Sequence, residues 1–182
     1  MAYRLKKTVV LVGMMGAGKT AVGKALAQML QAPFLDSDDE IVKAANMSIA
    51  EIFERDGEAF FRARETEVIA RLMDEERCVL SVGGGAFLSE VNREIVDSRG
   101  VAVWLRADLD LLWNRVRHKT TRPLLRTANP RATLAELLRA REPFYAKAPL
   151  IVDADASYSV EDMAHRVLQA LLTRPDILEK TE

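Results

Sequence analysis

Short apolar runs alternate with longer segments of helical periodicity along most of the chain. Apolar runs of this length, bounded by polar or turn residues, are typical of strands buried in a parallel sheet. Five of them predict strands, at Thr8–Val12, Ala32–Asp36, Cys78–Val82, Val101–Leu105 and Leu150–Asp153. Strands that alternate with helices predict an α/β fold, in which helices cover both faces of an open, five-stranded parallel sheet.

The segments between the runs carry apolar residues at helical spacing. In the first of them, Val22, Leu26 and Met29 fall on one face of a helix. We expect further helices at about Ser37–Ala45, Glu58–Met73, Ser89–Ser98, Asp108–Val116 and Val160–Leu172.

Two capping boxes, Ser48–Glu51 and Thr133–Glu136, each predict the start of a helix. The first of these helices should end at Gly57, because glycine is favoured just beyond a helix. The second should end near Pro143, because a proline inside a helix removes a backbone hydrogen bond. The tail from Thr173 follows the last predicted helix, and we expect it to fray.

The turn after the first strand fits G-x-x-x-x-G-K-[ST], the phosphate-binding loop. It comprises Gly13–Thr20, between a predicted strand and a predicted helix. Phosphate oxygens are expected at the backbone of Gly16, Ala17 and Gly18, at the N-terminus of the helix. Lys19 should neutralise the β- and γ-phosphates, and the Thr20 hydroxyl should bind Mg²⁺. The motif thus predicts a nucleoside triphosphate site, and the alternative is a tight turn that is rich in glycine by chance.

Two other segments should lie beside this loop, because ligands bind beyond the carboxyl ends of parallel strands. Asp36 and Asp38 follow the second strand, and Gly83–Gly85 follow the third. The two carboxylates could divide the support of Mg²⁺ and the acceptance of a proton from an attacking hydroxyl. Helix capping by Ser37 or Asp38 is the alternative. Three consecutive glycines suit the close approach of a ligand, and a flexible turn is the alternative.

Three arginines are candidate ligands for anions. Arg62 lies one helical turn before Glu65, so it could bind a substrate carboxylate or form an ordinary exposed ion pair. Arg122 lies in an irregular basic stretch, which suits a lid over ATP or a solvated loop. Arg141 lies near the expected end of a helix, where it could reach back into the crevice or complement the helix dipole.

Composition limits the remaining classes of protein. A length of 182 residues suits one domain, and a net charge of −1 argues against a nucleic-acid or membrane-surface partner. The single cysteine allows no intrachain disulfide and no cysteine-based metal site. We find no signal peptide and no apolar run of membrane length, so we expect a cytoplasmic protein. Small size and near-neutral charge are compatible with the monomer that we expect.

Together these segments resemble the shikimate kinases. The resemblance spans about Thr8 to Val152. It rests on Gly13–Thr20, Asp36-Ser37-Asp38, Ser48–Phe53, Phe61–Glu65, Gly83–Gly85, Arg122–Leu125 and Arg141–Tyr145. A large superfamily shares the phosphate loop, whereas the order and spacing of the whole set are specific.

The resemblance implies a single kinase domain over residues 1–182, with a fold like that of the nucleoside monophosphate kinases. A substrate-binding helical segment would lie at about residues 37–75 and a lid at about residues 118–131. The implied reaction transfers the γ-phosphate of ATP to the 3-hydroxyl of shikimate, on the route to chorismate and the aromatic amino acids. ATP and shikimate would be the small-molecule partners, and Mg²⁺ the cofactor.

Site roles follow by matching position. Asp38 would bind the shikimate hydroxyls and act as the base, with Lys19 and Arg122 as the other catalytic residues. Asp36 would support Mg²⁺ through water, together with Thr20. The two arginines that would hold the shikimate carboxylate are Arg62 and Arg141, with Gly84 beside them, and Arg122 would also bind ATP phosphates from the lid.

Two features depart from the family. Asn46 stands where many relatives carry glycine, and asparagine tolerates the left-handed conformation that such a turn needs. Residues 154–157 lack the arginine that some relatives place near the adenine, and Arg115 is a candidate for that contact by position. The alternative enzyme is another small-metabolite kinase of this fold, such as a gluconate kinase. The alternative from a different class is a nucleotide-binding regulator that has lost catalysis.

Overall fold

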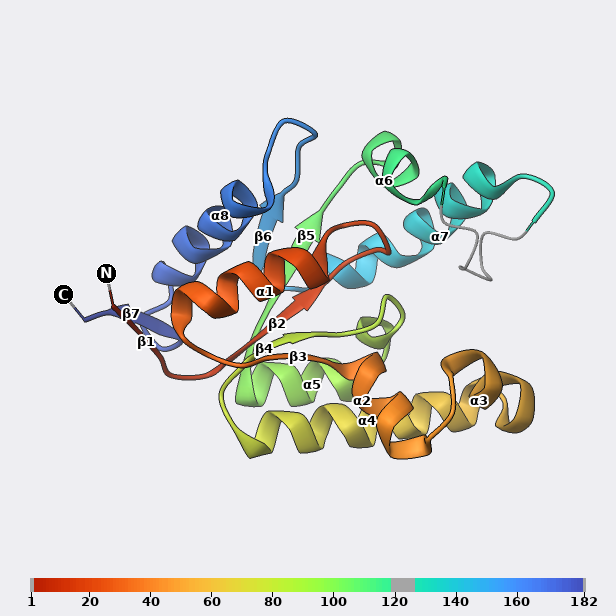
Figure 1. The fold of residues 1–182 in the computed structure, drawn as a ribbon, viewed down its shortest axis with the longest axis horizontal. Helices are drawn as coiled ribbons and strands as arrows, with labels where there is room; N and C mark the ends of the chain where they lie inside the picture. Colours follow the sequence, from red (N-terminus) through yellow and green to blue (C-terminus); the bar gives the residue numbers. More distant parts are fainter. Residues whose placement is uncertain (1, 119–126, 182) are drawn as a thin grey trace.

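The central sheet of the protein has five parallel strands. In the computed structural model, which describes residues 2–118 and 127–181, their order is β3-β4-β2-β5-β6 (Figure 1). The bounds are β2 Thr8–Val12, β3 Phe34–Asp36, β4 Val79–Ser81, β5 Gly100–Arg106 and β6 Leu150–Asp153. Every neighbouring pair is parallel, so the predicted fold class is confirmed.

The two central strands explain why the apolar runs are continuous. All five residues of β2 are buried, and β5 is buried up to Leu105. Helices cover both faces of these strands, so no position alternates toward solvent. Leu11 lies opposite Ser81 of β4 and Val103 of β5, which brings the carboxyl ends of the three strands to one edge of the sheet.

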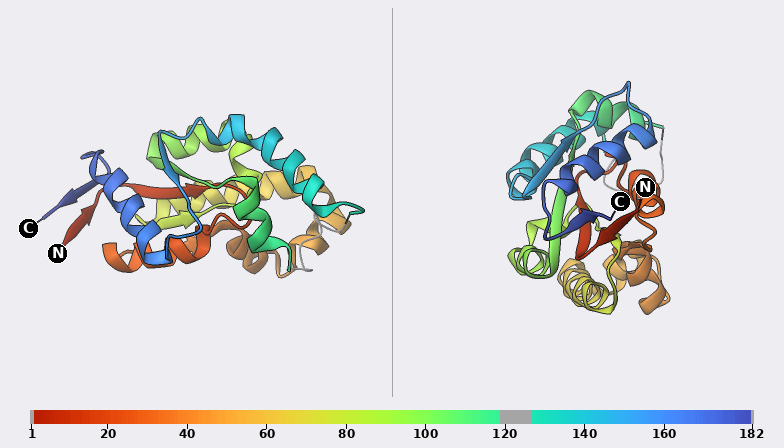
Figure 2. Two further views of the ribbon diagram at one scale, coloured as in Figure 1. Left: turned by 90° about the horizontal axis from the view of Figure 1, so that it is seen from above. Right: turned by 90° about the vertical axis from the view of Figure 1, so that its left-hand side faces the viewer.

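Helices cover both faces of the sheet (Figure 2). Their bounds are α1 Lys19–Leu30, α2 Ser37–Ala45, α3 Ile49–Asp56, α4 Glu58–Glu75, α5 Glu90–Arg99, α6 Leu109–Val116, α7 Pro130–Tyr145 and α8 Val160–Leu172, with a 3₁₀ turn, η1, at Ala86–Leu88. α1 and α8 pack against each other on one face, and α5 packs on the other. α2, α3 and α4 pack together beside the sheet. In residues 2–118 and 127–181, no helix has the length and apolarity needed to cross a membrane.

One predicted capping box is confirmed and the other is wrong. Ser48 and Glu51 cap each other at the start of α3, which ends at Gly57. α7 instead begins at Pro130, because Asn129 caps it and proline at the first helical position needs no N–H donor. Pro143 also fails to end α7, which continues to Tyr145. A proline in the last turn removes only one backbone hydrogen bond, so the helix tolerates it.

The expectation for Asn46 is confirmed. Asn46 follows the last residue of α2 with φ 52° and ψ 38°, in the left-handed region. The turn into Ser48 therefore keeps the conformation for which glycine is usually needed.

The C-terminal tail does not fray as expected. Leu178–Lys180 form β7, which pairs antiparallel with β1 (Tyr3–Leu5) at the end of the molecule where the two termini meet (Figure 1). Ile177 and Leu178 are buried, and Lys6 donates a backbone hydrogen bond of 2.7 Å to Ile177. The tail is ordered by a partner strand that begins the chain, which local periodicity does not reveal.

Leu178→Ala should therefore destabilise the protein. Loss of a fully buried leucine leaves a cavity where β7 packs against α8, and we expect the free energy of unfolding to fall by about 2–4 kcal/mol. Urea denaturation measures the change. Val91→Ala is the control, because Val91 is 54% exposed and its loss should cost under about 0.5 kcal/mol. Equal effects of the two substitutions would show that the tail adds nothing to the core.

Candidate functional site

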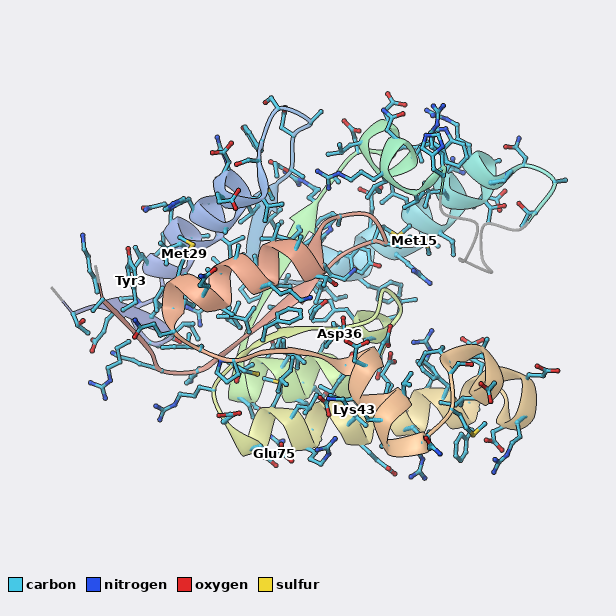
Figure 3. All side chains as sticks on the ribbon, in the orientation of Figure 1. Tyr3, Met15, Met29, Asp36, Lys43 and Glu75 are labelled. Carbon is cyan, nitrogen blue, oxygen red and sulfur yellow. The ribbon has the colours of Figure 1, made fainter. Side chains whose placement is uncertain are left out.

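A cavity of about 780 Å³ lies at the edge where the parallel strands end. Its lining combines the phosphate loop, the ends of β3 and β4, one face of α4, and Arg141 of α7. Figure 3 labels Met15 and Asp36, which reach this cavity from the phosphate loop and from β3. The sequence-predicted residues that line it are Gly16, Ala17, Gly18, Lys19, Thr20, Asp36, Asp38, Arg62, Gly84 and Arg141. Arg122 lies outside the described residues.

Cationic side chains bind the carbonyl groups of the phosphate loop. Gly16 and Gly18 have φ values of 86° and 96°, which glycine adopts without strain. The Lys19 Nζ donates to the carbonyl oxygens of Gly13, at 2.6 Å, and Met14, at 3.1 Å. Arg115 Nη1 donates to the carbonyl oxygen of Gly16 at 2.9 Å. Cations thus hold the carbonyl side of this loop, which suits binding of anions by its amide side.

One aspartate of the acidic segment caps a helix, and the other faces the cavity. Asp36 itself caps α2, with its Oδ1 accepting from the amides of Asp38 at 2.9 Å and Asp39 at 3.3 Å. The alternative of capping by Ser37 or Asp38 is therefore wrong, because Asp36 is the N-cap residue and the other two already lie inside α2. Capping by Asp36 leaves the carboxylate of Asp38 directed to the cavity that both residues line.

Burial shapes the acidity of both aspartates. Desolvation raises the pKa of Asp36, although the amides of Asp39 and Asp38 oppose the rise. Desolvation also raises the pKa of Asp38, the nearby charge of Asp36 adds to it, and Lys19 and Arg62 oppose it. Within the part of the chain that the structure describes, Asp38 Oδ1 is buried without a hydrogen-bond partner. A buried acceptor of this kind is available to a hydroxyl donor.

The ion pair between Arg62 and Glu65 joins a partly exposed guanidinium group to a buried carboxylate. Arg62 Nη1 lies 2.9 Å from Glu65 Oε1, and Glu65 is only 1% exposed. Burial raises the pKa of Glu65, while the charge of Arg62 lowers it. The pair is therefore not the fully exposed one that spacing alone allowed. Glu65 orients a guanidinium that lines the cavity.

Each of the three glycines makes room for a different charged side chain. A methyl group on Gly83 would lie 3.0 Å from Asp38 Oδ1, and one on Gly84 would lie 2.8 Å from Arg141 Nη1. One on Gly85 would lie 2.9 Å from Arg62 Cζ. The glycine loop, Gly83–Gly85, is thus the surface on which a carboxylate and two guanidinium groups converge.

Two residues that hold the glycine loop carried no predicted role. The Tyr145 hydroxyl donates to the carbonyl oxygen of Gly84 at 2.5 Å. The Asn92 side chain donates to Ala86 at 2.9 Å and accepts from Thr66 at 2.8 Å, which ties η1 to α4. The spacing of Arg141 and Tyr145, four residues apart on one helix, is a signal that could have suggested Tyr145. No local pattern marks Asn92.

The arrangement suits transfer of a phosphoryl group to a small, hydroxylated anion. One half of the cavity offers amides and a lysine for phosphates. The other half offers two guanidinium groups, which bind carboxylates through paired hydrogen bonds. Asp38 feels the charges of both Lys19 and Arg62, so it lies between the two halves, and its buried Oδ1 could accept a hydroxyl proton.

Comparisons with known proteins agree on one family. The family model described as shikimate kinase matches residues 15–172. A shikimate kinase of Ruegeria pomeroyi is 67% identical over 98% of this chain and 91% of its own length. One of Cereibacter sphaeroides is 65% identical over 98% of this chain and 89% of its own length.

Solved structures give the same family at high identity, and at low identity they share only the fold. A shikimate kinase from Acinetobacter baumannii, solved in complex with shikimate, has a TM-score of 0.86 and 40% identity, and the match covers 92% of this chain and 93% of that one. A gluconokinase from Sinorhizobium meliloti has a TM-score of 0.59 at 17% identity, over 93% of this chain and 94% of its own. The second likeness shows the fold alone.

Asp38→Asn should stabilise the protein. A carboxyl group whose pKa is raised on folding holds its proton more tightly when folded, so its ionised form opposes folding. We expect a gain of about 0.5–2 kcal/mol in the free energy of unfolding at pH 7. The gain should be complete above the pKa of the folded protein, decline as pH falls through it, and vanish below the ordinary value of 3.8.

Urea denaturation between pH 3 and pH 8 measures this difference. Asp97→Asn is the control, because Asp97 is exposed on α5 and its change should stay within about 0.5 kcal/mol. A variant that is no more stable than the wild type at pH 7 would contradict a cost of burying Asp38.

Proposed function

The chain belongs to the shikimate kinase family, and from that premise we propose a role for each residue of the cavity in the family reaction. The enzyme is an ATP-dependent kinase that acts on an alcohol group. The reaction transfers the γ-phosphate of ATP to the 3-hydroxyl of shikimate and gives shikimate 3-phosphate and ADP. The observation that carries the assignment of roles is the position of Asp38, between the phosphate loop and two arginines that meet at the glycine loop.

The phosphate loop would bind ATP. Phosphate oxygens would accept hydrogen bonds from the backbone of Gly16, Ala17 and Gly18, at the N-terminus of α1. The ammonium group of Lys19 would neutralise the β- and γ-phosphates. Arg122, from the proposed lid at residues 118–131, would bind the same phosphates and help to exclude water.

Thr20 and Asp36 would hold Mg²⁺. The Thr20 side chain is exposed in the cavity, and the hydrogen bonds that cap α2 engage only Oδ1 of Asp36. In the described residues, no group of three or more histidine, cysteine or acidic side chains could hold a metal ion alone. The Thr20 hydroxyl and the second carboxylate oxygen of Asp36 fit Mg²⁺, which such sites bind through few protein oxygens together with water and phosphate. When bound, the ion neutralises charge on the transferred phosphoryl group.

The opposite half of the cavity would bind shikimate. Arg62 and Arg141 would hold the carboxylate from two sides, with the Gly84 backbone beside them. The hydroxyl groups would then lie toward Asp38. This distribution matches a small anion with a carboxylate at one end and hydroxyls at the other.

Asp38 would act as the general base. Its carboxylate would accept the proton of the 3-hydroxyl as that oxygen attacks the γ-phosphorus atom. Burial and Asp36 raise its pKa, which makes it a stronger base, while Lys19 and Arg62 favour its ionised form. The environment thus balances proton affinity against the need for an ionised carboxylate at neutral pH.

The proposal also covers the substrate-binding segment, the cellular location and the oligomeric state of the enzyme. Residues 37–75 would form the substrate-binding segment, which contains α2, α3 and most of α4. We propose that the enzyme works in the cytoplasm as a monomer, with no nucleic-acid or membrane partner, since its net charge is −1.

The purified protein should release ADP from ATP and Mg²⁺ only when shikimate is present. Two arginines at one end of the cavity favour a carboxylate, and Asp38 favours a hydroxyl, so both features of shikimate are needed. A coupled assay of ADP measures the rate, with EDTA to remove the metal. Gluconate is the control acceptor, because it carries a carboxylate and hydroxyls on an open chain and so tests whether the cavity selects the shape of the acceptor. Turnover with gluconate alone would contradict the assigned acceptor site. Turnover that persists in EDTA would contradict the Mg²⁺ site.

Asp38→Asn should lower kcat by about 10²–10⁴-fold, because the amide keeps the size of the side chain but cannot accept the proton. Steady-state kinetics with ATP and shikimate measure the loss, and circular dichroism checks that the variant is folded. The surface variant Asp97→Asn should keep the wild-type kcat. An unchanged kcat for Asp38→Asn would remove Asp38 from the role of base.

A further inference from the structure

Tyr145 is the largest buried polar side chain beside the cavity, and none of the roles above uses it. It lies at the end of α7 and is 0% exposed. Its hydroxyl donates to the carbonyl oxygen of Gly84 at 2.5 Å, at the centre of the glycine loop. Its ring packs against Trp104 of β5, with the ring centroids 5.8 Å apart. The ring thus fixes the hydroxyl on the backbone that faces the substrate half of the cavity.

The hydroxyl connects three parts of the site. Arg141, one turn earlier on α7, lies over the same glycine: a methyl group on Gly84 would lie 2.8 Å from Arg141 Nη1 and 3.6 Å from the Tyr145 oxygen. Burial raises the pKa of Tyr145, and the nearby charge of Arg141 opposes the rise. Met14 Sδ of the phosphate loop lies 3.8 Å from the same oxygen. The Arg141 guanidinium and the Tyr145 phenol therefore meet at Gly84, where the phenol holds the carbonyl group.

The glycine loop needs such a contact because its residues have no side chains to anchor it. Three glycines lose more backbone freedom on ordering than other residues would. Among the residues that the structure describes, the amides of Gly84 and Gly85 donate to no acceptor. The carbonyl of Gly84 and the amide of Gly85 belong to one trans peptide and point in opposite directions. Fixing the carbonyl on Tyr145 therefore also fixes the direction of the free Gly85 amide.

We propose that the Tyr145 hydroxyl is a positioning group for the carboxylate end of the acceptor. It holds Arg141 and the Gly84–Gly85 peptide in the one arrangement that receives a carboxylate. Tyr145 touches neither substrate and takes no part in proton transfer. The proposal rests on the proposed function, since it assumes that Arg62, Arg141 and the glycine loop bind the shikimate carboxylate.

Tyr145→Phe tests the proposal, because it removes one oxygen and keeps the ring. The KM and the equilibrium Kd for shikimate should rise about five- to thirtyfold, whereas the KM for ATP should change less than about twofold. Thr8→Val is the matched control. Thr8 is buried at the opposite end of β2, and its hydroxyl accepts from the Cys78 amide at 3.2 Å. The control should lower the melting temperature without changing either KM.

The methyl ester of shikimate locates the effect at the carboxylate. The wild type should prefer shikimate to the ester in kcat/KM, and Tyr145→Phe should reduce this preference by about the factor lost in shikimate binding. An equal loss for both acceptors, or an unchanged KM for shikimate, would overturn the proposal. The proposal would also be overturned if Tyr145→Phe raised the KM values for shikimate and ATP equally and lowered the melting temperature as much as Thr8→Val does. Failure of the wild type to phosphorylate shikimate would instead overturn the proposed function, before any variant is compared.

Discussion

The absence of three side chains at the end of β4 is the constraint on which the site depends. Gly83–Gly85 allow Asp38, Arg141 and Arg62 to approach one short stretch of backbone. A β-carbon at Gly84 or Gly85 would occupy the position of a guanidinium group, so the arginines would have to move. Both guanidinium groups lie at the ends of flexible side chains that can move aside. A substitution at Gly84 or Gly85 would therefore disturb the geometry of the site more than the stability of the fold.

Carboxylates and cations around this loop influence the pKa values of one another. Asp36, Asp38 and Glu65 are each made less acidic by burial. Lys19 and Arg62 oppose that effect and keep carboxylates and cations in one cavity. In the described part of the chain, one oxygen of Asp38 and one of Glu65 are buried without a hydrogen-bond partner. A substrate hydroxyl could supply the donor that Asp38 Oδ1 lacks.

The fold sets the position of these groups but does not select the reaction. The parallel sheet brings the phosphate loop, Asp36 and the glycine loop to one edge. A gluconokinase at 17% identity shares the fold. What differs between chemistries is the set of side chains placed at this edge. Here it is two arginines on a glycine loop opposite a buried aspartate, and relatives with 65–67% identity are shikimate kinases.

The sequence by itself determined the features that rest on local chemistry. The loop Gly13–Thr20, the strand Thr8–Val12, and the bounds of α2 and α8 follow from spacing, capping and apolar periodicity, which neighbouring residues decide. Placement of Asp36 and Gly83–Gly85 at one edge also followed, because parallel strands must end together. The caps at Asp36 and at Asn129-Pro130 are likewise local signals, which prevailed over the neighbouring candidates. Tertiary structure alone decided that the tail pairs with β1. It also placed Tyr145 on Gly84, 61 residues away, because partners so distant along the chain meet only through packing.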